Sequence, residues 1–317
     1  MQCRICASNA SHRTYTVKEM MMGQLEEHEY FQCNHCHCLQ ITTIPDHLSD
    51  HYPSNYYSYV APNSQGGAKQ SLIRLRDQYA ATGKNMMGKA LQLLSPNAKL
   101  TTLRPLNLNE NSRILDVGCG AGLLLHSLRE VGFKHLLGLD PFNQDLIEYP
   151  NGLRIEKRDI FSETGQWDVI MFHHSFEHMP EQQATLKKVL ELLAPHGTAL
   201  LRVPTVTSYA WQHYGVNWVQ LDAPRHLFLH SVESMKVLAE QCGFKLDKSV
   251  YDSNAFQFWG SEQYEQGIML RDKNSWAENP EGSIFTAAQI KDFEKRAQEL
   301  NSLNQGDQAA FYLRKPS

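Results

Sequence analysis

Three glycines after a short apolar segment are the residues in this chain best suited to bind a cofactor. The segment Ile114–Val117 runs into Gly118, Gly120 and Gly122 in the sequence ILDVGCGAG. Glycine lets a ligand approach the backbone where a side chain would block it. Asp140 closes the next apolar run, 18 residues after Gly122. A carboxylate at that strand tip suits the two hydroxyls of a ribose, so we expect a nucleoside cofactor at the carboxyl edge of a parallel sheet.

A second group of residues carries acid–base chemistry. The segment 173–179 reads HHSFEHM and contains His174, Glu177 and His178, and a later segment, DAPRHLF, contains His226. Imidazole titrates near neutral pH, so these histidines are the candidates to remove a proton from an acceptor. We expect His174 or His226 to be the base, with Glu177 and His178 beside it. For His178 the alternative is a structural histidine bonded to the backbone.

The cysteines predict a metal site near the N-terminus. Five of the seven lie within the first 38 residues, and four form two CxxC pairs: Cys3, Cys6, Cys33 and Cys36. Two such turns can complete a tetrahedral zinc site, and so short a segment needs the metal to fold. Disulfides are disfavoured because no signal-peptide pattern precedes the cysteines. Spare residues that could replace a ligand are Cys38, His35 and His37.

The glycine spacing distinguishes between cofactors. A dinucleotide fingerprint, GxGxxG, would place its third glycine at 123, where the chain has Leu123, so a nicotinamide oxidoreductase is the weaker alternative. The form DxGxGxG, beginning at Asp116, instead resembles motif I of class I S-adenosylmethionine-dependent methyltransferases. The resemblance covers about residues 106–253 and a final strand at 307–315. Within it, a third strand ends at 158–161, a fourth spans Trp167–Phe172, and a helix end, a Pro-Gly turn and a fifth strand fill 192–203.

The resemblance implies an α/β fold, a doubly wound and mostly parallel seven-stranded sheet in the order 3-2-1-4-5-7-6 with the last strand antiparallel. Phe244–Tyr251 would be strand six and Ala309–Arg314 strand seven. The residues alone indicate only that each apolar strand is followed by a helical crossover, which predicts a doubly wound parallel sheet.

The resemblance also implies a set of cofactor-binding residues: Asp116, Gly118, Gly120, Gly122, Asp140, Pro141, Asp159, Ile160 and His173. Asp116 would hold the methionine amino group and Asp140 the ribose hydroxyls. Asp159 and the Ile160 amide would face the adenine, and the backbone carbonyl of His173 the cofactor's amino group. Each has a structural alternative, such as turn sterics for the glycines or a helix cap for Asp140.

Two narrower resemblances concern the acceptor. The Glu177–His178 pair is similar to that of ubiquinone-pathway O-methyltransferases, which hold a divalent ion with further carboxylates. Here the position three residues before Glu177 is His174, so we do not expect a catalytic magnesium. The order of zinc ribbon, tyrosine-rich connector and methyltransferase domain resembles nucleotide-deoxysugar C-methyltransferases, although only the insertion 254–305 stands where those proteins have a further C-terminal domain. C- and O-methylation both stay open, and so does a non-catalytic module whose ribbon docks a partner.

The remaining expectations come from composition and layout. With 317 residues, a net charge of −4 and a pI near 6.4, the chain has no basic footprint for nucleic acid and no run long enough to cross a membrane. We expect a cytoplasmic protein with a small-molecule acceptor, a nucleotide sugar being one candidate, and a homodimer as one candidate assembly.

We divide the chain into a zinc ribbon (1–44), a connector with a helical segment (45–105, the helical spacing at 71–94) and a methyltransferase domain (106–317). Aromatic residues that could line an acceptor pocket, or simply pack, are Tyr52, Tyr56, Tyr57, Tyr59, Trp211, Trp218 and Trp259.

Overall fold

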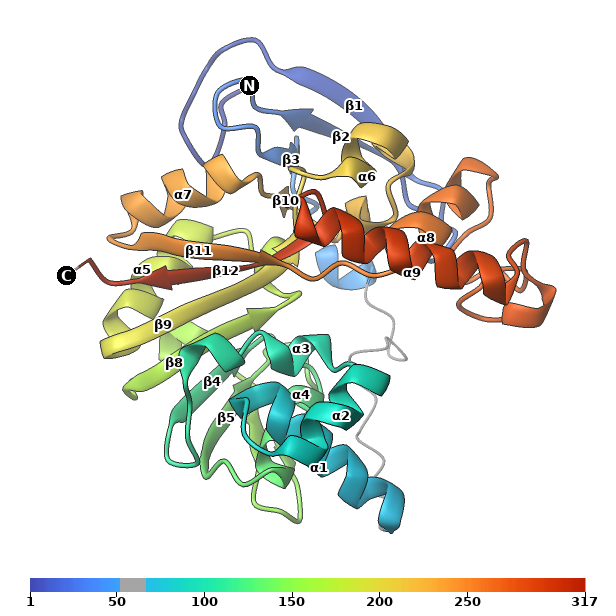
Figure 1. Cartoon of the computed structure of the whole chain (residues 1–317). Coiled ribbons are helices and arrows are strands. Elements are labelled where there is room, and N and C mark those ends of the chain that lie inside the picture. The colour runs from blue at the N-terminus through green and yellow to red at the C-terminus, as the bar shows by residue number, and fades with distance from the viewer. Residues whose placement is uncertain (52–66, 317) are drawn as a thin grey trace.

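A mostly parallel sheet forms the centre of the computed structural model, which describes residues 1–51 and 67–316 (Figure 1). Its strands are β4 (Arg113–Val117), β5 (His135–Leu139), β6 (Ile147–Glu148), β7 (Arg154–Glu156), β8 (Trp167–His173), β9 (Leu193–Pro204), β11 (Lys245–Tyr251) and β12 (Gln308–Arg314). The order is β11-β12-β9-β8-β4-β5-β7-β6. β12 is antiparallel to both its neighbours, so the predicted order and the reversed last strand are confirmed.

The described part of the sheet has eight strands rather than the predicted seven. The added strand, β6, is two residues long and pairs antiparallel with β7 at the edge. A turn closed by the Tyr149 N–H to the Leu153 carbonyl joins the two. A two-residue strand leaves no alternation of apolar and polar residues in the sequence, so the pattern could not predict it.

Alternate side chains of each strand supply two separate cores. On β4, Leu115 and Val117 belong to the core under the helices α5 (Gln182–Leu192) and α7 (Val232–Gln241), whereas Ile114 belongs to the core on the opposite face. That opposite face is covered by α1 (Ala68–Thr82) and α4 (Leu123–Glu130), as Figure 1 shows. The remaining α-helices are α2 (Met86–Leu94), α3 (Ala98–Thr101), α6 (Tyr209–Tyr214), α8 (Phe256–Glu265) and α9 (Ala287–Ser302). Short 3-10 helices are η1 (Leu48–His51), η3 (Arg104–Leu106), η4 (Ile160–Ser162), η5 (Phe176–His178), η6 (Gly215–Asn217), η7 (Val219–Leu221) and η8 (Pro280–Gly282).

Two predicted elements have different bounds in the structure. The helical segment 71–94 is two helices, because Gly83 ends α1 in a left-handed conformation and the Asn85 side chain caps α2. As a result, Met86 and Leu94 are exposed instead of sharing a buried face. The predicted Pro-Gly turn before the fifth strand is also wrong, because β9 already begins at Leu193. The residues between Leu193 and Thr198 form a bulge in the pairing of β9 with β8.

The N-terminal ribbon is completed by the rest of the chain. Its first two strands, β1 (Arg13–Lys18) and β2 (Glu27–Gln32), pair antiparallel between the two CxxC pairs. A third strand, β3 (Leu39–Ile41), then pairs with β10 (Phe228–Leu229), which lies beyond β9 in the chain. The ribbon therefore lies against the sheet domain, at the top of Figure 1. The tyrosines 52, 56, 57 and 59 lie outside the described residues.

Candidate active site

The glycine turn after β4 has the backbone shape and the close contacts that exclude side chains. Gly118 and Gly122 have φ values of 71° and 73°, in the left-handed region. A Cβ on Gly118 would lie 2.5 Å from the Cβ of Ser175, and one on Gly122 would overlap Ile155. Turn sterics alone thus account for these two glycines. They also form the tight connection from β4 to α4 that a cofactor cradle of this kind uses.

Asp140 connects the end of β5 to that turn. Its Oδ2 accepts the Gly120 N–H at 2.7 Å and its Oδ1 accepts the Phe142 N–H at 2.9 Å. Pro141 lies between Asp140 and Phe142 in the chain. The Asn143 amide donates to the Gly120 carbonyl at 2.9 Å, so the turn is fixed from both sides. Burial raises the pKa of Asp140, and the two backbone donors oppose that effect. Each carboxylate oxygen keeps a further lone pair for a ribose hydroxyl.

Asp116 is the buried carboxyl group closest to the glycine turn in sequence. Its side chain is 3% exposed, and its Oδ1 has no hydrogen-bond partner among the described residues. Burial and the nearby charge of Asp140 raise the pKa of Asp116 to about 8, so it holds a proton at neutral pH. An unpartnered buried oxygen of this kind can accept a hydrogen bond from a ligand's ammonium group.

The next predicted cofactor residues, Asp159, Ile160 and His173, lie after β7 and at the end of β8. Asp159 is exposed and caps η4 through the Ser162 N–H at 3.2 Å, which places the buried Ile160 at the first position of that helix. His173 ends β8, and both its ring nitrogens are buried without a partner among the described residues. Burial and the adjacent Arg202 charge lower the pKa of His173 well below its usual range, so this ring is neutral.

Glu177 is the centre of a buried cluster with three histidines. Its side chain is 0% exposed, and neither carboxylate oxygen makes a well-formed hydrogen bond among the described residues. Nδ1 of His174 lies 3.3 Å from Oε1 and Nε2 of His226 lies 3.9 Å from it. Burial alone would raise the pKa of Glu177, but His174, His178 and His226 together lower it to about 2. The group is therefore an ionised carboxylate in a buried position.

The backbone fixes the ring of His226. Its Nδ1 lies 2.8 Å from the Gln220 carbonyl oxygen, which can only accept, so Nδ1 carries the proton. Nε2 is left as the acceptor, 3.9 Å from Glu177 and 3.8 Å from Asp222. An imidazolium formed at Nε2 would lie between two carboxylates.

Gln220 is itself held by Asp307. The Gln220 amide donates to Oδ2 of Asp307 at 2.8 Å, and the indole N–H of Trp218 donates to the same oxygen at 3.0 Å. Trp218 is completely buried and Trp211 is 7% exposed, and their rings are 6.2 Å apart. In the described residues both tryptophans therefore pack in the core, as does the partly buried Trp259.

His174 and His178 have different partners. Nη1 of Arg202 lies 2.5 Å from Nε2 of His174, and because a guanidinium only donates, this nitrogen is the acceptor and Nδ1 donates toward Glu177. Arg202 is held in turn by Asp252, at 2.6 Å. His178 bonds the Arg225 carbonyl through Nδ1 at 2.9 Å, which matches the structural alternative for this residue. Burial and His226 lower the pKa of His178.

The four predicted cysteine ligands come together in the ribbon. Cys3 and Cys36 have sulfurs 3.6 Å apart, as do Cys6 and Cys33. All four are free thiols, and their sulfurs lie within 4.8 Å of one another. A tetrahedral zinc site with Zn–S bonds of about 2.3 Å has sulfur–sulfur edges of about 3.8 Å, so the group fits zinc.

The spare residues lie outside that group. Cys38 is buried and its thiol points to the Leu39 carbonyl oxygen at 3.6 Å, whereas His35 and His37 are exposed.

Sequence patterns did not indicate the residues that orient these side chains. Arg202, Gln220 and Asp307 belong to no motif, and each lies at least five residues from the group that it holds. A polar residue inside an apolar strand was the available signal for Arg202, which interrupts the buried run of β9.

Comparison with known proteins identifies the fold family. The family model described as "Methyltransferase domain" matches residues 87–249, about half of the 317 residues. The chain belongs to this family. It thus carries an S-adenosylmethionine-dependent methyltransferase domain, and the predicted fold class is confirmed.

Curated relatives match only part of their length. The ubiquinone biosynthesis O-methyltransferase of Paraburkholderia xenovorans is 26% identical over 154 residues, 41% of this chain and 66% of the relative. The protein of the same name from Azorhizobium caulinodans is 29% identical over 136 residues, 39% of this chain and 52% of the relative. The matches thus span about half to two thirds of these relatives.

Solved structures give weaker matches. An S-adenosylmethionine-dependent methyltransferase from Mesorhizobium loti aligns with a TM-score of 0.44 at 16% identity, covering 70% of this chain and all of that one. The mycolic acid cyclopropane synthase CmaA1 complexed with SAH aligns with a TM-score of 0.46 at 16% identity, covering 86% of this chain and 99% of that one.

Among the described residues, no helix is both long enough and apolar enough to cross a membrane.

Proposed function

We propose that the protein transfers a methyl group from S-adenosylmethionine to a small molecule that loses a proton in the reaction. The observation that carries this proposal is the pair formed by Glu177 and His226. Glu177 follows β8, and the glycine turn follows the neighbouring strand β4. A carboxylate buried without a well-formed hydrogen bond, beside an imidazole with one fixed acceptor nitrogen, is an arrangement for taking up a proton.

The cofactor residues proposed from the sequence fit the group that the family binds. Asp140 and its two backbone donors would hold the ribose, Asp116 the methionine ammonium, and the η4 end around Ile160 the adenine. S-adenosylmethionine, when bound, supplies a methyl group already activated by its sulfonium charge. The protein's own task is then to align the acceptor and to exclude water.

We assign the proton to His226 rather than to His174. Nε2 of His174 already bonds Arg202, so that ring serves to orient Glu177. Nε2 of His226 faces Glu177 and Asp222, both of which would stabilise the imidazolium. Glu177 thus acts by charge, and His178, bonded to the Arg225 carbonyl, completes the wall of the cluster.

For the acceptor we propose a sugar nucleotide or a related glycan precursor. The layout of ribbon, connector and methyltransferase domain supports it, and the relatives that methylate oxygen support a hydroxyl as the methylated group.

We also propose the three-part division at 1–44, 45–105 and 106–317, with structural zinc held by the four cysteines. The rival function, a non-catalytic module, would need the ribbon free for a partner, yet its β3 edge already pairs with β10.

Calorimetry with S-adenosylmethionine and a mass-spectrometric screen test the proposal together. The chain should bind the cofactor, and extracts incubated with it should contain a compound heavier by one methylene, formed with an equal amount of S-adenosylhomocysteine. Absence of cofactor binding would refute the methyltransferase function. Binding without methyl transfer to any candidate acceptor would favour the non-catalytic module.

A further inference from the structure

We propose that the N-terminal ribbon holds the acceptor site in place and that Tyr30 and Glu19 are positioning residues for His226. The inference rests on the proposed function of His226. It concerns residues 222–227, which follow η7 and carry that histidine, and which we call the acceptor loop. Three sets of contacts connect this loop to the ribbon, and a fourth connects it to Glu177.

A single residue, Leu227, joins the ribbon to the catalytic cluster through the backbone. Its N–H donates to the Glu177 carbonyl at 2.9 Å, and its carbonyl accepts the Ile41 N–H at 3.0 Å. The strand pairing of β3 with β10 continues directly from that bond. A shift of β3 would therefore move Leu227 and, through it, the backbone that carries Glu177.

Tyr30 fixes the backbone of the histidine itself. Its ring is 0% exposed, and its hydroxyl donates to the His226 carbonyl at 2.9 Å. The Gln220 carbonyl holds the imidazole from the other side. The backbone of His226 is thus set by the ribbon and its ring by the sheet domain, so the direction of Nε2 depends on both.

Glu19 fixes the residue before the histidine. Oε1 of Glu19 and Oδ1 of Asp222 each lie 2.6 Å from Nη2 of Arg225, and the side chains of Glu19 and Arg225 are both 0% exposed. Removing the Glu19 charge would leave Arg225 paired with Asp222 alone, and losing a buried charge partner costs far more than losing a surface pair. Glu19 thus holds the acceptor loop to the ribbon by a bond that solvent cannot replace.

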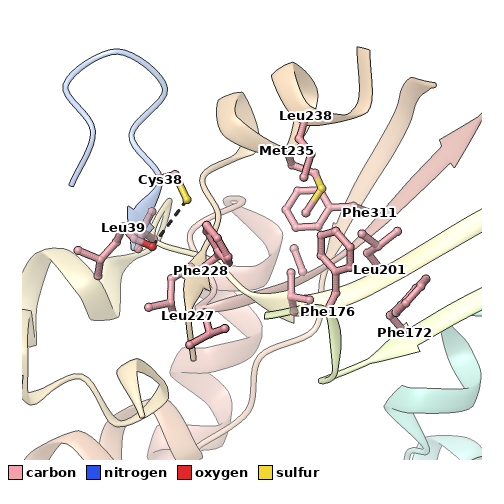
Figure 2. Close-up of a cluster of buried hydrophobic side chains, with 14 of the residues drawn as sticks. Cys38, Leu39, Phe172, Phe176, Leu201, Leu227, Phe228, Met235, Leu238 and Phe311 are labelled. Carbon is pink, nitrogen blue, oxygen red and sulfur yellow. Dashed lines mark hydrogen bonds between the residues drawn. The ribbon is translucent and has the colours of Figure 1, made fainter. Parts of the chain in front are cut away.

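Apolar packing makes the two parts one body. Figure 2 shows Leu39 of β3 beside Phe228 of β10, followed by side chains of α7 and of the sheet such as Met235 and Phe311. The four-cysteine cluster also contacts the rest of the chain, because the Ser231 hydroxyl donates to the Cys36 carbonyl at 2.6 Å. The cysteine end of the ribbon is therefore bonded to the start of α7.

Tyr30→Phe tests the proposal most cleanly, with Tyr15→Phe as the matched control. Both variants lose one hydroxyl in the ribbon, but the Tyr15 hydroxyl bonds Gln32, within the ribbon. In the full zinc-loaded chain, hydrogen exchange of the acceptor loop should speed up about fivefold to tenfold in Tyr30→Phe. The imidazole NMR signals of His226 should also shift from those of a fixed Nδ1–H tautomer. Identical loop exchange and identical His226 signals in the two variants would overturn the proposal.

Glu19→Gln, with Glu29→Gln as its control, extends the test. Glu29 is exposed and accepts from Thr16 on the ribbon's own surface. Glu19→Gln should speed exchange in the acceptor loop more than Tyr30→Phe does. It should lower kcat without changing the KM for S-adenosylmethionine. If Glu19→Gln does not fold, Tyr30→Phe decides alone.

The two proposals can fail separately. If the wild-type chain binds S-adenosylmethionine and the variants exchange in the acceptor loop at the wild-type rate, the positioning role alone is refuted. Faster loop exchange in a chain that binds no S-adenosylmethionine would refute the proposed function while the ribbon–loop coupling stands.

Discussion

Asp140 accepts the backbone N–H of Gly120 at 2.7 Å, so the end of β5 is bonded directly to the glycine turn after β4. The turn and the carboxylate are thus a single unit before any ligand binds. Two features 20 residues apart are therefore joined by one hydrogen bond, which supports the proposal that both contact one cofactor. A ligand that uses Asp140 meets a preformed surface and loses less entropy on binding.

Asp140→Ala should weaken S-adenosylmethionine binding about 10- to 100-fold. Charge-assisted hydrogen bonds to the ribose contribute about 1.5–3 kcal/mol, and the variant also removes the bond that shapes the turn. Titration calorimetry measures the change. Asp145→Ala, an exposed carboxylate five residues away, is the control and should bind as the wild type does. Equal affinities for the two variants would show that the ribose does not bind at Asp140.

Asp116 should couple cofactor binding to pH. Its pKa is raised to about 8 by burial and by Asp140, so the folded chain binds a proton there that the unfolded chain has lost above pH 4. The stability contributed by this group is therefore full at low pH and is lost as the pH rises through 8. The ammonium of S-adenosylmethionine favours the ionised form, so binding at pH 7 should release a proton and affinity should rise with pH up to about 8.

Calorimetry in two buffers of different ionisation enthalpy measures that proton. Asp116→Asn should abolish the release, and Asp247→Asn, an exposed position on β11, should keep it. A wild-type chain that binds S-adenosylmethionine with no proton release would contradict the assignment of Asp116 to the ammonium group.

The zinc prediction separates the four ligands from the fifth nearby cysteine. Cys33→Ser should lose the single zinc per chain and much of the ribbon's stability, because the segment depends on its metal. Cys38→Ser should retain one zinc, since Cys38 lies outside the sulfur cluster. Elemental analysis and thermal unfolding measure both effects. A Cys38→Ser chain without zinc would show that the ligand set is wrong.

The strands and the glycine turn could be predicted because they depend on local patterns, and the sheet order followed from the family that those patterns resemble. Apolar strands, a DxGxGxG turn and paired CxxC motifs are contiguous, so each can be recognised in a few residues. The break at Gly83 was missed because the helical spacing continues past it, and the irregular start of β9 was missed because Pro195 and Gly197 suggested a turn.

The contacts that orient the site were not predictable in this way. Tyr30 and His226 are 196 residues apart, and Gln220 and Asp307 are 87 apart. Nothing in the local sequence around Tyr30 distinguishes a core tyrosine from one whose hydroxyl bonds a distant loop. The motif residues could be identified from the sequence, whereas the residues that hold them in place required the fold.

The most direct test of the chemistry is His226→Gln. Glutamine keeps a polar side chain of similar length but cannot take up the acceptor's proton, so kcat should fall about 10²- to 10⁴-fold, the usual contribution of a general base. The affinity for S-adenosylmethionine should not change, because none of the proposed cofactor contacts involves His226. His196→Gln, at an exposed position in β9, controls for the loss of an imidazole. The methyl transfer rate under single turnover measures the effect. A rate within a few-fold of wild type would mean that the acceptor transfers no proton to this ring, and Glu177 would then stabilise positive charge on the acceptor itself.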